Sequence, residues 1–112
     1  MERHGAKTFE YLKDMSAGFI ALGRRNTLAS TFSTIKHAED SVITALHAGR
    51  ARIAQWLSSN AKGDHPISLT MQKAVGWGVD GAKKVNGLKN VTVILRKDGH
   101  GSFNVLTAYP GR

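Results

Sequence analysis

Hydrophobic side chains recur every three or four positions over residues 34–59, a spacing that predicts a long amphipathic helix. A glycine costs about 1 kcal/mol in a helix interior, so a break is expected near Gly49. Two shorter helical stretches are predicted before this helix, over residues 8–15 and 17–25. The apolar stripe of the long helix consists of Ile35, Ala38, Val42, Leu46, Gly49, Ile53 and Trp56.

Toward the C-terminus the pattern changes to alternation, which is typical of strands. Residues 91–96 and 102–109 are separated by a five-residue connection that contains glycine, and together they predict a β-hairpin. Alternation along the last strand assigns one face to four side chains, those of Phe103, Val105, Thr107 and Tyr109.

The middle of the chain has weaker strand signals, over residues 67–71 and 74–79. Turns are expected after them at Asp80-Gly81 and Asn86-Gly87. Helices followed by strands, without alternation of the two, favour an α+β fold over a wound parallel sheet. The length of 112 residues suits one domain that covers residues 1–112.

The balance of charged residues indicates which class of partner the protein binds. Sixteen Lys and Arg residues face eight Asp and Glu residues, a formal net charge of +8. Such an excess favours an anionic partner, with nucleic acid first, an anionic membrane second and an acidic protein third. No apolar run is long enough for a membrane span, and we expect no signal peptide. The absence of cysteine excludes disulfides.

The chemistry-bearing residues narrow the function further. None of the five histidines is spaced like a zinc motif, and the acids are too scattered for a paired-carboxylate hydrolase. We therefore predict neither a metal nor another cofactor. The basic residues are distributed rather than blocked, which suits a groove that follows an RNA backbone. A soluble basic protein without a nucleic-acid role remains the alternative at this point.

Three stretches, in this order, form a recognisable set. They are residues 3–8 followed by Leu12, residues 29–32 with a helix that ends in residues 52–57, and residues 91–96 leading to residues 105–110. Together they resemble the bacterial pancreatic-ribonuclease-like toxin domains found at the C-termini of contact-dependent growth-inhibition proteins. The resemblance covers nearly the whole chain, and it rests on the order and spacing of these stretches together with the segment Thr-Ala-Tyr-Pro close to the chain end.

The resemblance implies an active site made of a His and an Arg from the N-terminal region and a Thr and a Tyr from the last strand. His4, Thr107 and Tyr109 match three of these residues. The position of the Arg is occupied by Met15, and we predict that Arg24 or Arg25 replaces it. Lys7, Arg25 and Arg96 are the predicted RNA-binding cations.

The resemblance also implies a shape and a reaction. The expected fold is pancreatic-ribonuclease-like, with N-terminal helices packed on a curved antiparallel sheet and RNA bound in the cleft between them. The expected activity is that of a metal-independent endoribonuclease toxin that forms a 2′,3′-cyclic phosphate. Its expected core comprises Val42, Leu46, Ile53, Trp56, Val93 and Leu95.

Partners and location follow from the same resemblance. We expect an RNA substrate, a cognate acidic immunity protein and a free monomer. We also expect secretion or delivery as part of a larger toxin, with action in the cytoplasm of a target bacterium.

The residues themselves fit these roles. RNA cleavage without metal needs a base for the 2′-OH, donors for the charged phosphate and an acid for the leaving oxygen. An imidazole such as that of His4 is the natural base near neutral pH, and Tyr109 is the acid, with His100 as a substitute.

Other readings stay open on the sequence alone. Thr107 and Tyr109 also suit ordinary strand packing, and His4 suits a frayed chain end. A non-catalytic RNA- or DNA-binding module and a degenerate member retained for protein interaction are the rival functions, the latter because of Met15.

Overall fold

The computed structural model describes residues 8–112 and contains three helices and six strands within them. In chain order they are α1 (Phe9–Ala21), β1 (Leu28–Phe32), α2 (Ile35–Ala48), α3 (Arg50–Ser58), β2 (His65–Thr70), β3 (Gly76–Asp80), β4 (Lys83–Leu88), β5 (Asn90–Lys97) and β6 (Phe103–Gly111). The α+β class is confirmed. No helix within the described residues is long and apolar enough to cross a membrane.

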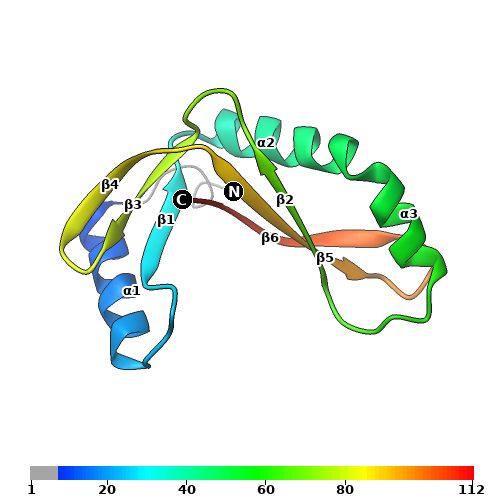
Figure 1. Ribbon diagram of the computed structural model, residues 1–112, viewed down its shortest axis with the longest axis horizontal. Helices are drawn as coiled ribbons and strands as arrows, with labels where there is room; N and C mark the ends of the chain where they lie inside the picture. Colours follow the sequence, from blue (N-terminus) through cyan, green and yellow to red (C-terminus); the bar gives the residue numbers. More distant parts are fainter. Residues whose placement is uncertain (1–7) are drawn as a thin grey trace.

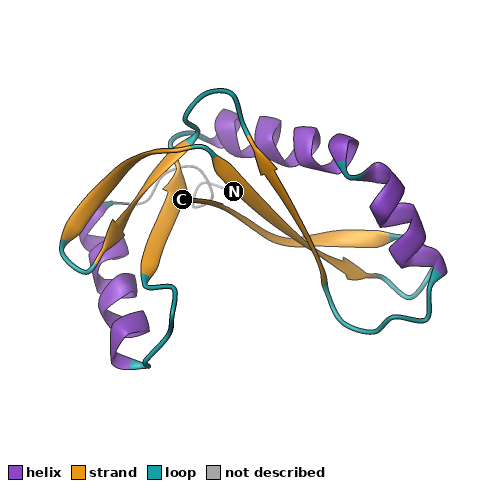
Figure 2. Cartoon of the chain, viewed as in Figure 1, coloured by secondary structure: helices purple, strands orange, loops and turns teal. Residues whose placement is uncertain are grey.

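The strands form two antiparallel sheets of three rather than one continuous sheet. Their orders are β1-β3-β4 and β2-β5-β6. Figure 1 shows the two sheets meeting at an angle, with α1 beside the first sheet and α2 and α3 along the second. The helices, purple in Figure 2, lie on the outer sides of the bent molecule, so the inner side between the sheets is left to strands and loops.

Two hydrophobic cores hold the helices against the sheets, and the larger one also includes Phe32 of β1. Leu12 of α1 is fully buried against Ala29 and Val79 of the first sheet. The larger core joins α2 and α3 to the second sheet. It consists of Phe32, Ala45, Ile53, Trp56, Ile67, Val75, Val91, Val93 and Leu95, with Val42 and Leu46 partly buried beside them. This core contains every residue expected from the sequence.

The helical predictions are partly confirmed. The long helix breaks at Gly49, which ends α2 and precedes α3, as the cost of glycine suggests. The two N-terminal stretches are wrong as separate elements, because α1 runs through without interruption and ends at Ala21. Thr8 caps this helix by accepting a hydrogen bond from the Tyr11 N–H.

Of the strands, the C-terminal hairpin and the two weaker segments are confirmed with small shifts in their ends. β1 and β4 were not predicted. The turn at Gly81 is present, with a φ of 66° that glycine adopts without strain. The turn expected at Asn86-Gly87 is wrong, because these residues form an irregularity inside β4, opposite Trp77.

Candidate active site

A cleft of about 800 Å³ lies between the α1–β1 unit and the second sheet. Its lining comes from segments far apart in sequence: α1 and the loop after it, β1, and the three strands of the second sheet. The lining residues are Met15, Phe19, Arg24, Asn26, Leu28, Ala29, Ser30, Ser68, Leu69, Thr70, Asn90, Thr92, Thr107, Ala108, Tyr109, Pro110, Gly111 and Arg112. Three of the predicted site residues, Arg24, Thr107 and Tyr109, are therefore in one cleft.

The cleft floor is polar because of the register of the second sheet. Ser68 pairs with Thr92, and Thr92 pairs with Tyr109, so three hydroxyl side chains form a row across β2, β5 and β6. The next row contains Ile94 and Thr107. The opposite face of β5 carries the buried Val91, Val93 and Leu95, so the sheet presents its polar face to the cleft and its apolar face to α2 and α3.

Thr107 and Tyr109 share this face, and their hydroxyls are available to a ligand. Tyr109 is 40% exposed, and Thr107 is also exposed. Within residues 8–112 neither side chain forms a hydrogen bond with another residue. Two hydroxyls one strand repeat apart are about 7 Å apart along the strand, a span that a phosphate and its ester oxygens can bridge.

The prediction that Phe103 and Val105 share this face is wrong. Val105 pairs with Leu95, whereas Thr107 pairs with Ile94, so Leu106 is an additional residue in β6. Such a bulge reverses the alternation. It turns Thr107 and Tyr109 to the cleft while Val105 lies on the side of the buried Leu95.

Arg24 reaches the cleft through the way α1 ends. Gly23 has a φ of 71°, the Gly23 N–H donates to the Ile20 carbonyl, and the Arg24 N–H donates to the Phe19 carbonyl. This is the Schellman pattern, which folds the chain back over the last helical turn. As a result the Arg24 guanidinium lies 4.6 Å from the centre of the Phe19 ring, a cation–π contact at the cleft wall.

A second cation, Arg112, also lines the cleft. Arg112 Nη2 donates to Asp80 Oδ2 at 2.8 Å, and Thr27 Oγ1 donates to Asp80 Oδ1 at 2.5 Å. The hydrogen bond from Thr27, followed by that from Arg112, lowers the pKa of Asp80 below its ordinary value. The ionised Asp80 thus joins β3 to the segment before β1 and to the C-terminal residue.

Because the pKa of Asp80 is lowered, the free energy of unfolding depends on pH in the acid range. A carboxyl whose pKa is lower in the folded chain contributes stability above its unfolded pKa of about 3.9, and this is lost as pH falls through the folded value. We expect the urea midpoint of the native protein to fall as the pH decreases below about 4, and to fall less steeply in Asp80→Asn. Asp14→Asn, on the exposed side of α1, is the control and is expected to keep the native slope.

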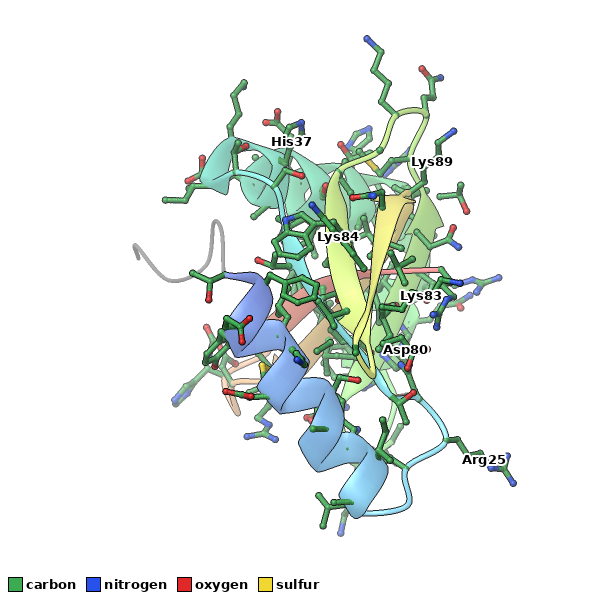
Figure 3. All side chains as sticks on the ribbon, turned by 90° about the vertical axis from the view of Figure 1, so that its left-hand side faces the viewer. Arg25, His37, Asp80, Lys83, Lys84 and Lys89 are labelled. Carbon is green, nitrogen blue, oxygen red and sulfur yellow. The ribbon has the colours of Figure 1, made fainter. Side chains whose placement is uncertain are left out.

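Two of the other predicted site residues, Arg25 and Arg96, do not line the cleft. Arg25 is exposed, is not among the cleft residues, and extends outward from the loop after α1 in Figure 3. Arg96 donates to both carboxylate oxygens of Asp64, at 3.0 and 3.2 Å, at a separate shallow hollow. His4 and Lys7 lie outside the described residues.

Basic side chains also follow the first sheet. Lys83 and Lys84 are on β4 and Lys89 follows it, as Figure 3 shows. The Lys84 ammonium lies 4.9 Å from the centre of the Trp77 ring. The positive charge is therefore distributed over the molecule, as the sequence indicated.

The remaining histidines have structural or surface positions. His65 was expected in a loop, but it begins β2 and stacks on Trp56 with 5.1 Å between ring centres. His37 bonds to the cap residue Thr34, and His100 is exposed in the turn before β6. Among residues 8–112, no three His, Asp or Glu side chains gather into a group that could hold a metal ion.

Several cleft residues were not identified from the sequence. Thr92 and Ser68 are directed to the cleft by strand register, and the alternation of Thr92 with Val91 and Val93 was the available signal. Ser30 and Arg112 had no signal, because β1 was not predicted and an arginine at the C-terminal end resembles any surface cation.

Comparison with known proteins shows the family and the fold of this chain. Residues 1–110 match the family model described as the bacterial CdiA-CT RNase A domain. A toxin chain in the crystal structure of a CdiA-CT/CdiI complex from Y. kristensenii 33638 has the same fold, with a TM-score of 0.82 and 24% identity. That match covers 98% of this chain and 96% of the other. No curated protein sequence matches. With almost its full length matched, this chain belongs to the CdiA-CT RNase A family of bacterial ribonuclease toxin domains.

Proposed function

We propose that this domain is a metal-independent endoribonuclease that cleaves RNA by attack of the 2′-OH on the adjacent phosphodiester. The observation that supports this most is that Thr107, Tyr109 and Arg24 line one cleft, where the two hydroxyls form no hydrogen bond with another of the described residues. The cleft contains both hydrogen-bond donors and a cation. Among residues 8–112, no His, Asp and Glu side chains gather into a group that could hold a metal ion. Arg24 and the hydroxyls of Thr107 and Tyr109 are side chains that can stabilise the charge on the phosphate in this cleft.

In this reaction the imidazole of His4 removes the proton of the 2′-OH, and O2′ attacks phosphorus to form a pentavalent intermediate. The bond from phosphorus to O5′ then breaks, O5′ accepts a proton, and the 3′ end is left as a 2′,3′-cyclic phosphate. His4 has this role by its match to the family motif.

The structure supports roles for the other groups. Thr107 and Tyr109 donate hydrogen bonds to the phosphate oxygens, and Tyr109 is the proton donor to O5′. The pKa of a free phenol is about 10, so the donor needs a nearby positive charge as the reaction proceeds. Arg24, fixed over Phe19, supplies that charge at the same cleft.

The polar row on the cleft floor suggests the path of the substrate. Ser68 and Thr92 continue from Tyr109 across the sheet, and both are neutral residues able to donate and accept. We place the nucleotide next to the scissile phosphate along this row, with the RNA strand crossing the β-strands.

The proposal predicts cleavage of single-stranded RNA in excess EDTA. The labelled products should include a fragment that ends in a 2′,3′-cyclic phosphate, identified by mass spectrometry. The same oligonucleotide with 2′-deoxyribose at every position should bind without being cut, because it lacks the nucleophile. Cleavage that requires an added divalent cation, or cleavage of the DNA strand, would contradict this mechanism.

A separate prediction concerns the cation. Arg24→Gln should lower kcat/KM for RNA by roughly 10- to 100-fold, since a charge-assisted contact to the phosphate is lost. Arg52→Gln makes the same change in net charge on α3, outside the cleft, and should change kcat/KM less than twofold. Equal effects of the two variants in a cleavage assay at fixed salt would show that only net charge matters.

A degenerate toxin domain retained for protein binding is the second candidate, because apolar Met15 lines the cleft at the position where the family motif has its Arg. On this alternative, the native chain cuts no RNA between pH 5 and 9 and still binds an acidic partner. A gain of cleavage in Met15→Arg would support it.

The biological setting is part of the same proposal. The structural relative was crystallised as a CdiA-CT/CdiI complex, and we propose a cognate immunity protein, acidic in character, that neutralises this domain. We further propose that the domain is a monomer when free, is delivered from a larger CdiA-type protein, and acts on RNA in the cytoplasm of a target bacterium.

A further inference from the structure

Pro110, the residue after Tyr109, lies where the two sheets meet. Its side chain is almost completely buried, unlike that of the exposed Tyr109. Proline has no N–H, so the polar link from this residue to the first sheet has to use its carbonyl. The buried Pro110 and the ion pair of Arg112 with Asp80 are therefore among the contacts that hold the end of β6 to β1 and β3.

Ser30 provides the polar part of this link. Its hydroxyl donates to the Pro110 carbonyl at 2.6 Å, across 80 positions of sequence. Ser30 is in the middle of β1, in the sheet that does not contain β6. The bond therefore joins one sheet to the other at the wall of the cleft, which both residues line.

Gly76 provides the steric part. A Cβ atom added at this position would lie 2.6 Å from Pro110 Cγ and also too close to the Thr31 carbonyl oxygen. Real Cβ atoms essentially never come within 3.0 Å of another heavy atom. The missing side chain of Gly76 is thus what allows the Pro110 ring to pack onto β3.

We infer that Ser30 and Gly76 are positioning residues for Tyr109, an inference that rests on the proposed function. They fix Pro110 against the first sheet, and Pro110 in turn fixes the adjacent residue Tyr109 relative to Arg24 and to the α1–β1 wall. Arg24 follows α1, which packs on the first sheet, whereas Tyr109 is in β6 of the second sheet. The contact of Pro110 with the first sheet therefore sets the distance between a cation and a hydroxyl that act on one phosphate.

The test compares Ser30→Ala with Ser30→Thr, which restores the hydroxyl. A displacement on the order of 1 Å can cost about 100-fold in rate, so Ser30→Ala should lower kcat by roughly 10- to 100-fold with KM within about twofold. Ser30→Thr should have a kcat close to that of the native protein. Ser58→Ala removes a similar hydroxyl-to-carbonyl bond at the exposed end of α3 and should be unchanged.

A second readout does not depend on activity. The chain has only two tyrosines, Tyr11 and Tyr109. In protein labelled with ¹³C-tyrosine, Ser30→Ala should shift or broaden the ring signal of Tyr109 and leave that of Tyr11 in place. Tyr11→Phe assigns the two signals.

The outcomes separate the two proposals. If native protein fails to cut RNA, the proposed function is wrong, and the tyrosine spectrum alone then decides whether Ser30 positions Tyr109. If native protein cuts RNA and Ser30→Ala keeps native kcat and an unmoved Tyr109 signal, the positioning role is overturned. It is also overturned if Ser30→Thr is as slow as Ser30→Ala. Gly76→Ala, where it folds, should reproduce the loss in kcat.

Discussion

Replacing His4 with alanine is expected to lower RNA cleavage by roughly 10²- to 10⁴-fold, the usual contribution of a positioned general base. Binding of a 2′-deoxy oligonucleotide should stay within about twofold, because contacts to the phosphates come from the cleft cations and hydroxyls. The measurement pairs single-turnover cleavage with a fluorescence binding titration at the same salt concentration, since binding to a basic surface depends strongly on salt.

The pH profile of the same variant gives an independent check. A histidine that acts as a base must be neutral, so native kcat/KM should decline as pH falls below about 6.5. This decline should be absent from the residual activity of His4→Ala. His47→Ala, on the exposed surface of α2, is the matched control and should keep both rate and profile. Full activity in His4→Ala would exclude His4 as the base.

The predictions from sequence succeeded where a local signal had one physical meaning. Apolar spacing predicted the helical region of α2 and α3, and the interior glycine predicted the break at Gly49. Both signals are local, because the buried face of a helix and the free-energy cost of a glycine within it depend on residues about one turn apart. The hairpin of β5 and β6 was predicted by alternation around a glycine loop. Thr107 and Tyr109 were assigned to one face correctly because they are only two residues apart.

The errors occurred where distant residues decide local structure. β1 is short and nearly fully buried, so its residues 28–32 carry no alternation, and its strand form depends on pairing with β3. The bulge at Leu106 is likewise set by the register with β5. Neither feature can be found from spacing within its own segment.

The candidate site shows the same division. The residues of β6 could be identified from a motif near the chain end, whereas the replacement cation could only be narrowed to Arg24 or Arg25. The choice depends on the turn at Gly23, which directs Arg24 over Phe19 at the cleft wall and leaves Arg25 outside the cleft. The pairing of Arg96 with Asp64 could not be predicted from sequence either, because the two residues are 32 positions apart.

Tyr109→Phe should lower kcat by roughly 10²- to 10³-fold, the cost typical of removing one donor to a developing oxyanion. The substitution keeps the ring and removes only the hydroxyl, which has no partner among residues 8–112, so the melting temperature should stay close to native. Rapid-quench cleavage and thermal unfolding measured on one preparation separate the two effects. A large fall in melting temperature with an unchanged kcat would assign Tyr109 to packing.

Thr107→Val tests whether the two hydroxyls act on one phosphate. If they do, the fold-loss of kcat in the double variant Thr107→Val/Tyr109→Phe should be smaller than the product of the fold-losses in the two single variants. Donors that act as a unit do not have additive effects on the activation free energy. Thr44→Val removes a hydroxyl bonded to the Asp40 carbonyl on α2 and controls for the loss of a threonine hydroxyl elsewhere. Independent, multiplicative losses would place the two hydroxyls on different groups of the substrate. The shared face of β6 would then serve two contacts along the RNA, and the proton for O5′ would have to come from Tyr109 without help from Thr107.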